Sequence, residues 1–330
     1  MIRLLLSSLA MAPFALQLEA AEPLRAGIIG CDTSHVPAFT KLFNSRPELG
    51  VRVVAAYPGG SPDLPASRDR VAGYTAQLRE EFGVQVVDSI EKLLEKVDVV
   101  LLESVDGRPH LEQVRPVLKA RKPVFIDKPV AGTLADALQI YDMAREHGVP
   151  VFSSSSLRFS PGILGMRDNA DVGKVLGCDA YGPCALEEHH PDLFWYGIHG
   201  VETLFTIMGT GCTSVTRVQT KDTELVVGVW KDGRVGTFRG LRAGRSDYGA
   251  TVFGTKAIAQ AGKYAGYEPL VVQIAEFFRT GKPPVSAEET IEIFAFMEAA
   301  DESKRKGGGP VSLESVLAKA RSAIANASGK

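Results

Sequence analysis

Lys128 is the residue of this sequence best placed to do chemistry. It follows the short apolar run 123–126 and Asp127, and it precedes Pro129. A lysine at this point stands at the carboxyl end of a strand, where ligands bind in open α/β sheets. Its ammonium group can hold a hydroxyl or carbonyl oxygen of a substrate and share its proton. We therefore expect Lys128 to be catalytic, against the plainer interpretation of an ordinary surface lysine.

His199 is the second candidate for proton transfer. It lies in a predicted helix, and Glu202 follows three residues later on the same face. The Glu202 carboxylate could orient the imidazole for acid or base chemistry. The alternative is a packing histidine that Glu202 merely satisfies. His35 and His110 are further candidates, because each follows a predicted strand closely and lies near its carboxyl edge.

A polar segment and three aromatic residues surround the start of that helix. Residues 187–192 read Glu-Glu-His-His-Pro-Asp, and residues 194–196 read Phe-Trp-Tyr. Together they could bind a sugar, with the aromatic rings as a platform, or form an imidazole/carboxylate metal site. The alternatives are a solvated loop and core aromatic residues. The substrate-binding candidates here are His190, Asp192, Trp195 and Tyr196; no metal ligand set is predicted, and His190 and His199 are candidates only in a metal-assisted alternative.

The elements that must position these side chains fall into two patterns. Short apolar strands alternate with helices in the first half of the chain, which predicts βαβ units and a parallel sheet. The predicted strands are 24–30, 51–57, 84–87, 98–102, 123–126 and 149–153. After about residue 155 the strands follow one another directly, with Lys231-Asp232-Gly233 as a hairpin signal. This indicates a mainly antiparallel sheet.

The sequence thus predicts an α/β protein with two domains after a leader. Residues 22–154 form a Rossmann-type, doubly wound parallel sheet, and residues 155–330 form an α+β domain with an open, mainly antiparallel sheet. Residues 1–21 are interpreted as a signal peptide, because Arg3 precedes a short apolar stretch that ends before small residues. We therefore expect an exported, periplasmic protein. Its four cysteines are scattered, and the spacing leaves open whether any pair is bridged.

Composition excludes some classes of partner. The chain has 330 residues, enough for two cores, and a net charge of −2. It has no basic stripe and no run of like charges, so we expect no nucleic acid partner. No segment after the leader is long and apolar enough to anchor the chain in a membrane.

Five short motifs in a fixed order resemble the Gfo/Idh/MocA family of sugar oxidoreductases. They cover most of the chain after the leader. They are Gly-Ile-Ile-Gly-Cys at 27–31, Phe-Ile-Asp-Lys-Pro at 125–129, Leu-Arg-Phe-Ser-Pro at 157–161, Gly-Lys-Val at 173–175 and Gly-Ile-His-Gly-Val-Glu at 197–202.

The resemblance implies a function and a set of site residues. It implies NAD or NADP as cofactor, a small sugar-like substrate, and a homo-oligomer formed through the open face of the second sheet. Lys128 and His199 would face each other as the catalytic pair. The other residues that it implies are Gly30, Asp32, Thr33, Ser34, His35, Tyr57 and His110 for the cofactor, beside Lys128, and Arg158 for the substrate.

Several positions depart from the family pattern. A dinucleotide loop needs Gly-x-Gly-x-x-Gly, but Asp32 and His35 replace the second and third glycines. An aspartate there adds bulk and a like charge beside the pyrophosphate; its alternative role is a helix N-cap. The second strand ends in Tyr57 rather than in the acid that holds the ribose. Trp195 replaces the aspartate that precedes the family's histidine.

Three functions are therefore open at this point. The first is an NAD(P)-dependent oxidoreductase that acts on a sugar, polyol or related hydroxyl compound. The second is a non-redox lyase or hydrolase of oxidised sugars on the same scaffold, assisted in one version by a divalent metal. The third is a carbohydrate-binding protein. Fold alone does not choose among them.

Overall fold

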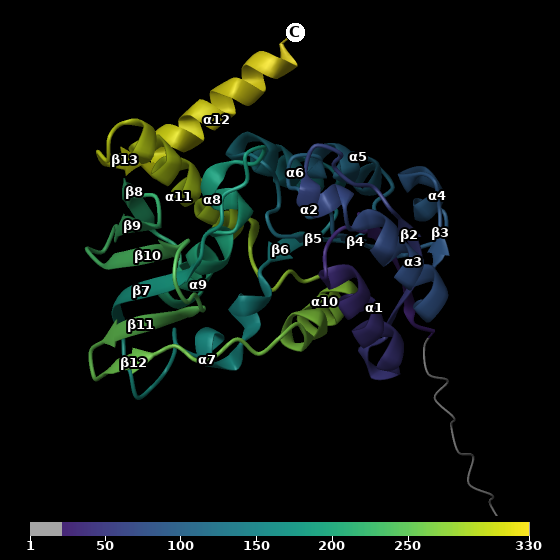
Figure 1. The fold of residues 1–330 in the computed structure, drawn as a ribbon, viewed down its shortest axis with the longest axis horizontal. Coiled ribbons are helices and arrows are strands. Elements are labelled where there is room, and N and C mark those ends of the chain that lie inside the picture. Colours follow the sequence, from purple (N-terminus) through teal and green to yellow (C-terminus); the bar gives the residue numbers. More distant parts are fainter. Residues whose placement is uncertain (1–21, 330) are drawn as a thin grey trace, which may run out of the picture.

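The computed structural model describes residues 22–329 and shows two domains joined along one side (Figure 1). The predicted signal peptide, residues 1–21, lies outside the described residues. The first domain holds a six-stranded sheet. Its strands are β1 (Leu24–Ile29), β2 (Val51–Tyr57), β3 (Gln85–Val86), β4 (Val99–Leu102), β5 (Val124–Asp127) and β6 (Val151–Ser154).

Every neighbouring pair in this sheet is parallel, in the order β3-β2-β1-β4-β5-β6. This confirms the predicted doubly wound sheet. β4 and β5 are buried along their whole length, because helices cover both faces and leave no face for polar residues. The order reverses between β1 and β4, which opens a crevice at their carboxyl ends.

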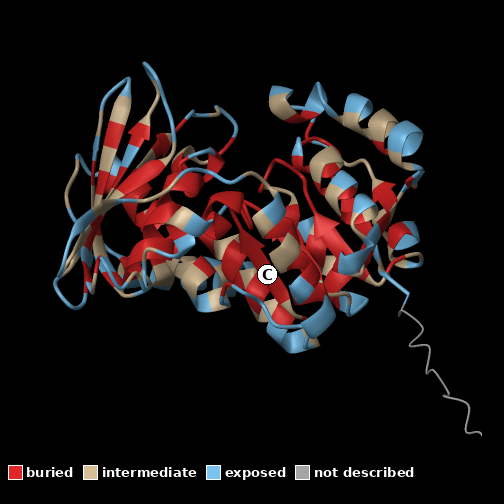
Figure 2. Ribbon diagram, turned by 90° about the horizontal axis from the view of Figure 1, so that it is seen from below, coloured by how far each residue is buried: buried red, intermediate tan, exposed pale blue. Residues whose placement is uncertain are grey.

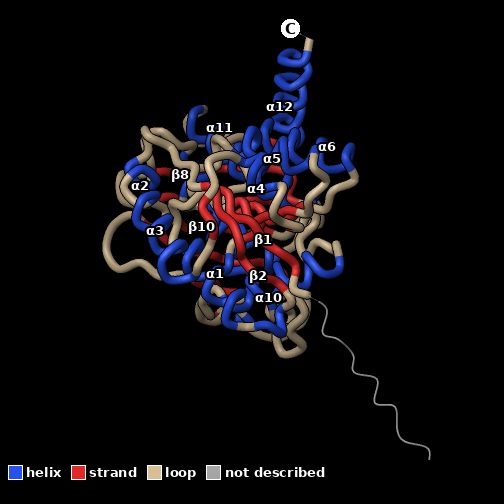
Figure 3. The backbone as a smooth tube through the Cα atoms, turned by 90° about the vertical axis from the view of Figure 1, so that its right-hand side faces the viewer, coloured by secondary structure: helices blue, strands red, loops and turns tan. Residues whose placement is uncertain are grey.

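The helices of the first domain lie on both faces of the sheet. Figure 3 shows α1 on one side of the strands and α4 and α5 on the other. Their bounds are α1 (His35–Ser45), α2 (Pro65–Arg68), α3 (Val71–Phe82), α4 (Ile90–Leu94), α5 (His110–Lys119) and α6 (Leu134–His147), with a 3₁₀ turn η1 (Pro47–Leu49). Ser89 and Thr133 accept hydrogen bonds from the amides three residues on and so begin α4 and α6, as predicted.

The second domain is built on a seven-stranded sheet in the order β12-β11-β7-β10-β9-β8-β13. Only the central β7 and β10 pair in parallel, which confirms a mainly antiparallel sheet. The strands are β7 (Val175–Pro183), β8 (Cys212–Gln219), β9 (Thr223–Trp230), β10 (Val235–Leu241), β11 (Gly249–Gly254), β12 (Ile258–Gln260) and β13 (Val311–Ser312).

One face of this second sheet is covered and the other is open. Helices α9 and α11 pack on the covered face, and the strands alternate between buried and exposed positions (Figure 2). The helical elements are η2 (Ser156–Phe159), α7 (Pro161–Leu164), α8 (Asp192–Trp195), α9 (Ile198–Met208), α10 (Glu268–Thr280), α11 (Ala287–Arg305) and α12 (Leu313–Ser328). Exposed Val218 and Ile258 are among the apolar residues outside this cover.

Helix α10 crosses back to the first domain. Figure 1 shows it beside α1, and its buried Ile274 and Phe277 share one apolar cluster with Phe39 and Phe152. The predicted division at residue 155 therefore does not separate two independent units, because a helix late in the chain completes the core under the first sheet. No apolar pattern within α10 itself indicates which sheet it covers.

Two properties of the described residues bear on the other predictions. No helix within residues 22–329 is long and apolar enough to cross a membrane. Cys31, Cys178, Cys184 and Cys212 are all buried and carry free thiols. Burial raises the pKa of each of these thiols, so they are unreactive core residues.

Gly200 tests the packing of α9 on the second sheet. A Cβ atom at Gly200 would overlap the ring of Phe238 on β10, so Gly200→Ala should lower the free energy of unfolding by about 1–3 kcal/mol. Gly73→Ala in α3 is the control, because no atom lies within 4 Å of its Cβ position. It should raise stability by about 0.5–1 kcal/mol. Urea unfolding followed by circular dichroism measures both. Equal effects would contradict the tight contact.

Candidate functional site

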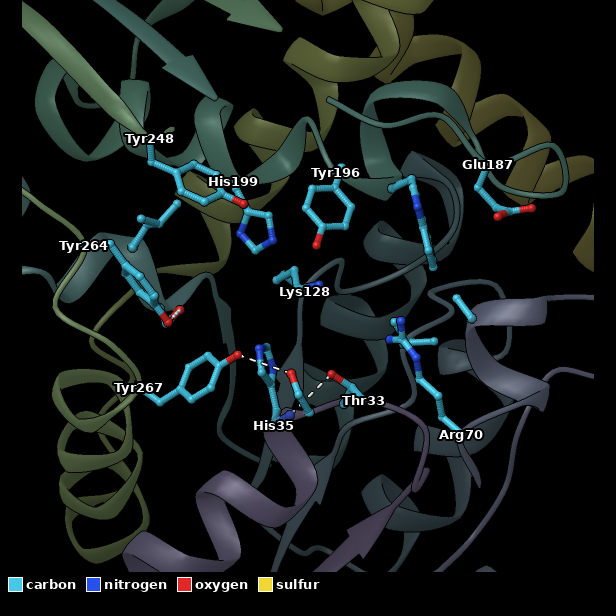
Figure 4. A pocket seen from close by; sticks show the side chains of 16 residues that line it. Thr33, His35, Arg70, Lys128, Glu187, Tyr196, His199, Tyr248, Tyr264 and Tyr267 are labelled. Atoms are coloured by element: carbon cyan, nitrogen blue, oxygen red, sulfur yellow. Dashed lines mark hydrogen bonds between the residues drawn. The ribbon is translucent and has the colours of Figure 1, made fainter. Parts of the chain in front are cut away.

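A cavity of about 470 Å³ lies between the two domains at the carboxyl edge of the first sheet. Figure 4 shows Lys128 near its centre, with His199 on one side and His35 on the other. Lys128 follows β5 directly and is 8% exposed. The parallel sheet therefore places this lysine at the edge where the sequence predicts it.

Asp127 supports the lysine from the end of β5. His35 Nδ1 lies 2.8 Å from Asp127 Oδ2, and both side chains are buried. Burial opposes ionisation of Asp127, but the neighbouring His35 and Lys128 hold its pKa below the ordinary value. A carboxylate thus lies behind Lys128 and His35 at this wall of the cavity. His35 lines the cavity as a partner of Asp127.

His199 faces the cavity from the first turn of α9. Its Nδ1 lies 2.8 Å from Ser155 Oγ, which orients the ring. Burial, and after it the charges of Lys128 and His35, lowers the pKa of His199 well below its usual value. The imidazole is therefore neutral near pH 7, which is the form that accepts a proton.

The Glu202 carboxylate forms its hydrogen bonds with residues other than His199, so it does not orient the imidazole directly. The carboxylate accepts hydrogen bonds from Ser154 Oγ at 2.6 Å, from the Ser155 amide at 2.7 Å and from Arg158 Nε at 2.7 Å. Glu202 thus fixes the segment that carries Ser155, and it positions His199 through that serine. Sequence spacing found the right helix face but not the intervening segment.

Arg158 is committed to this network rather than to the cavity. It is 4% exposed, and its guanidinium also donates to Glu289 Oε1 at 2.8 Å. Two carboxylates therefore hold the arginine that was predicted to bind substrate. The Arg158 side chain does not line the cavity.

Aromatic rings make up much of the remaining wall. Trp195 and Tyr196 line the cavity, as expected for a platform. Tyr248, Tyr264 and Tyr267 join them from the connections on either side of β11 and β12 (Figure 4). No motif in the sequence singles out these three tyrosines, because the turns that bring them here are fixed by pairing in the second sheet.

The hydroxyl groups of two tyrosines pair with serines at the cavity, and only the Tyr267–Ser34 pair joins the two domains. Tyr264 Oη lies 3.1 Å from Ser156 Oγ, and Tyr267 Oη lies 3.3 Å from Ser34 Oγ. Burial raises the pKa of Tyr264 to about 12, so this phenol keeps its proton near pH 7. The wall thus offers neutral hydroxyl groups and ring faces, which suit a polyhydroxy ligand.

Besides Arg158, four more predicted site residues lie outside the cavity. His110 is fully buried, with Nε2 2.9 Å from Ser104 O, and it serves the fold. Asp192 pairs with Arg217 and Lys304. His190 also lies outside the cavity, and its ring packs against Trp195. Tyr57 lines a separate hollow with residues 88–91.

The predicted metal candidates are not brought together. His199 lines the cavity, whereas His190 Nε2 lies 3.9 Å from Asp106 Oδ1 outside it. Across residues 22–329, no group of three histidine, cysteine, aspartate or glutamate side chains has the geometry to hold an ion.

Asp32 spans the crevice between β1 and β4. Its Oδ1 accepts a hydrogen bond from the Val105 amide at 2.8 Å, and its Oδ2 accepts one from Ser67 Oγ at 2.5 Å. Asp32 is fully buried, and it does not cap α1, whose N-cap is Ser34. Thr33 and Ser34 line the cavity beyond it, and a Cβ atom at Gly30 would overlap Ser104.

Acidic groups lie at this end of the sheet as well. Glu103 follows β4, is fully buried, and has two carboxyl oxygens without a hydrogen-bond partner among the described residues. Burial raises the pKa of Glu103 well above its usual value, and Asp127 and Asp32 add to the rise. Burial thus favours the protonated form of Glu103.

Comparisons with known proteins agree with this architecture. Residues 24–155 match the family model described as "Oxidoreductase family, NAD-binding Rossmann fold". The fold resembles that of GenD2 from gentamicin A biosynthesis, solved in complex with NAD. The TM-score is 0.71 at 17% identity, and the likeness covers 92% of this chain and 99% of that one.

Two curated relatives are similar over part of the chain. A dTDP-3,4-didehydro-2,6-dideoxy-alpha-D-glucose 3-reductase of Streptomyces violaceoruber is 27% identical over 158 residues, which are 48% of this chain and 42% of the relative. A 1,5-anhydro-D-fructose reductase of Ensifer adhaerens is 32% identical over 114 residues, which are 34% of this chain and 33% of the relative. The chain thus matches less than half the length of either relative.

The buried Glu103 predicts a pH dependence of stability. The unfolded chain releases this proton above about pH 4.3, whereas the folded chain retains it to higher pH, so wild-type stability falls as pH rises between the two pKa values. Glu103→Gln cannot titrate. Its stability relative to wild type should improve from pH 5 to pH 8, by at most about 1.4 kcal/mol per pH unit. Urea unfolding across this range measures the trend. The exposed Glu112→Gln is the control, and a flat difference for Glu103→Gln would contradict a neutral Glu103.

Proposed function

We propose that the chain is an NAD(P)-dependent oxidoreductase of the Gfo/Idh/MocA type that acts on a sugar, polyol or related hydroxyl compound. The match of residues 24–155 to the oxidoreductase family model supports the proposal. One observation carries the proposal: Lys128 and His199 line the same cavity. The two curated relatives are named as reductases of sugars, which supports a sugar-like substrate.

The proposed chemistry of this chain is proton transfer at a hydroxyl-bearing carbon. Neutral His199 accepts the proton of the substrate hydroxyl, with its ring held through Ser155. The Lys128 ammonium donates a hydrogen bond to the same oxygen and stabilises the negative charge that develops there. Tyr196 and Tyr264 offer ring faces and a hydroxyl group to the rest of the substrate. In the reverse direction the same groups return the proton to a carbonyl oxygen.

The crevice does not fit a dinucleotide as its residues now lie. Asp32 occupies the place of the glycine that lets the pyrophosphate approach, and its carboxylate would repel the phosphates. Ser67, which belongs to α2, lies against it. We therefore derive no step through the cofactor. The proposed oxidoreductase activity requires that the residues around Asp32 move.

A second candidate function follows from the filled crevice. A non-redox lyase or hydrolase of oxidised sugars would need no dinucleotide, and it could use Lys128 and His199 as an acid/base pair in the same cavity. A carbohydrate-binding protein would use the tyrosine wall alone. The paired Lys128 and His199 favour an enzyme over a binding protein.

Location and assembly are proposals of the same kind. We propose export to the periplasm, supported by the charged start and apolar stretch of residues 1–21. We propose a homo-oligomer through the open face of the second sheet, supported by exposed Val218, Val229 and Ile258. Cell fractionation and light scattering test these two proposals.

The first test of the function is a cofactor census on protein made from residues 22–330. Purified protein is denatured, and released dinucleotide is sought by absorbance and mass. NAD⁺ and NADP⁺ are then titrated against the intact protein by calorimetry. Retained or bound dinucleotide supports the oxidoreductase. If neither wild type nor Asp32→Gly binds a dinucleotide, the redox proposal fails and the lyase or hydrolase takes its place.

The catalytic pair is tested once turnover has been found in a screen of polyols and sugars. Lys128→Met and His199→Gln should each lower kcat by about 10²–10⁴-fold, because each removes one partner in proton transfer. His189→Gln is the matched control, because His189 is exposed and does not line the cavity. Activity that survives both substitutions at the wild-type rate would contradict the assignment.

A further inference from the structure

Ser61, Leu64 and Ser67 of the segment 61–70 contact residues that follow β1 and β4. We propose that this segment is a displaceable plug over the crevice between β1 and β4, which NAD(P) must move in order to bind. The inference rests on the proposed oxidoreductase function and adds a condition for cofactor entry. Ligands of doubly wound sheets bind in this crevice, where the strand order reverses. The segment lies after β2 and includes α2.

Asp32 is the inner latch of the plug. Its carboxylate joins three parts of the chain, because it follows β1, accepts from the Val105 amide after β4, and accepts from Ser67 Oγ in α2. Ser67 Oγ accepts in turn from the Ser61 amide at 2.8 Å, which closes the segment on itself. The carboxylate thus takes hydrogen bonds at the place where a phosphate would be held.

The loop after β4 provides an outer latch. Ser61 Oγ donates to Asp106 Oδ2 at 2.6 Å. Arg108 donates to both oxygens of Asp63, at 2.8 and 3.0 Å, and also to Asp106. The Asp63 pair is exposed, so this latch is the weaker of the two.

Leu64 anchors the plug by apolar contact. It is fully buried and forms a small cluster with Val105 and Trp195, separate from the two main cores. Trp195 also lines the substrate cavity, as do Ala66 and Arg70 of the segment. The plug therefore touches the crevice on one side and the substrate cavity on the other.

The segment has few buried contacts to lose when it moves. Within the segment every third residue is buried, namely Ser61, Leu64 and Ser67. The exposed residues are Pro62, Asp63, Pro65 and residues 68–70. Segments with few buried apolar contacts open at a low cost in free energy. The Asp32 contacts and one leucine thus hold the plug, and cofactor binding competes with them.

The test compares dinucleotide affinity in wild type and in a variant without the latch. NAD⁺ and NADP⁺ are titrated by calorimetry against wild type, Asp32→Gly and Asp69→Gly. Asp32→Gly should bind at least one of them ten-fold or more tightly than wild type, because it frees Ser67 and restores room for the pyrophosphate. Asp69→Gly is the matched control: it removes the same charge from the exposed side of the segment and should bind like wild type. Thermal unfolding establishes that each variant is folded.

Trp195 supplies a second readout that does not depend on activity. Movement of Leu64 away from the Trp195 indole ring should change tryptophan emission as dinucleotide binds. The substitution Trp195→Phe should abolish that change. Equal affinities of wild type and Asp32→Gly, or binding without a Trp195 signal, would overturn the plug and leave the oxidoreductase proposal standing. Absence of binding by every folded variant would overturn the plug and also end the proposal of an NAD(P)-dependent activity.

Discussion

The Glu202 carboxylate is the interaction on which the arrangement of the two domains depends. It accepts hydrogen bonds from the hydroxyl of Ser154, the last residue of β6, from the Ser155 amide and from the Arg158 guanidinium. These donors lie where the parallel sheet ends. Because Glu202 lies on α9, one buried carboxylate joins the edge of the first sheet to the central helix of the second domain. Burying it is tolerable only because hydrogen bonds and a cation satisfy it. The position of His199 relative to Lys128 follows from this junction.

The sequence predicts those features of the molecule that depend on local pattern. Buried strands, capped helices and Lys128 at a strand end follow from short runs of residues, and they are found where expected. Asp32 is recognised from the sequence as an obstacle, but its partners are not, because Val105 and Ser67 lie 73 and 35 residues away along the chain. The three tyrosines and the return of α10 depend on long-range packing, and no periodicity encodes it.

Electrostatics sets the character of the two halves of the site. The substrate cavity has Lys128 and His35 at its wall, backed by the Asp127 carboxylate. The crevice instead holds Asp32 and Glu103, and burial raises the pKa of both carboxyl groups. An anionic cofactor would therefore meet carboxyl groups in the crevice, whereas the oxygen of a substrate would meet the Lys128 side chain in the cavity.

Helix α10 gives the molecule a mechanical property. The chain passes between the domains after β6, again on entering α10, and a third time on leaving it for α11. The two domains are therefore connected by three separate segments of the chain. A hinge with one connection can swing freely, but three separated connections restrain rotation about every axis that does not pass near all of them. These connections restrict large-scale closure of one domain upon the other. Entry of a ligand then depends on local movements of small surface segments.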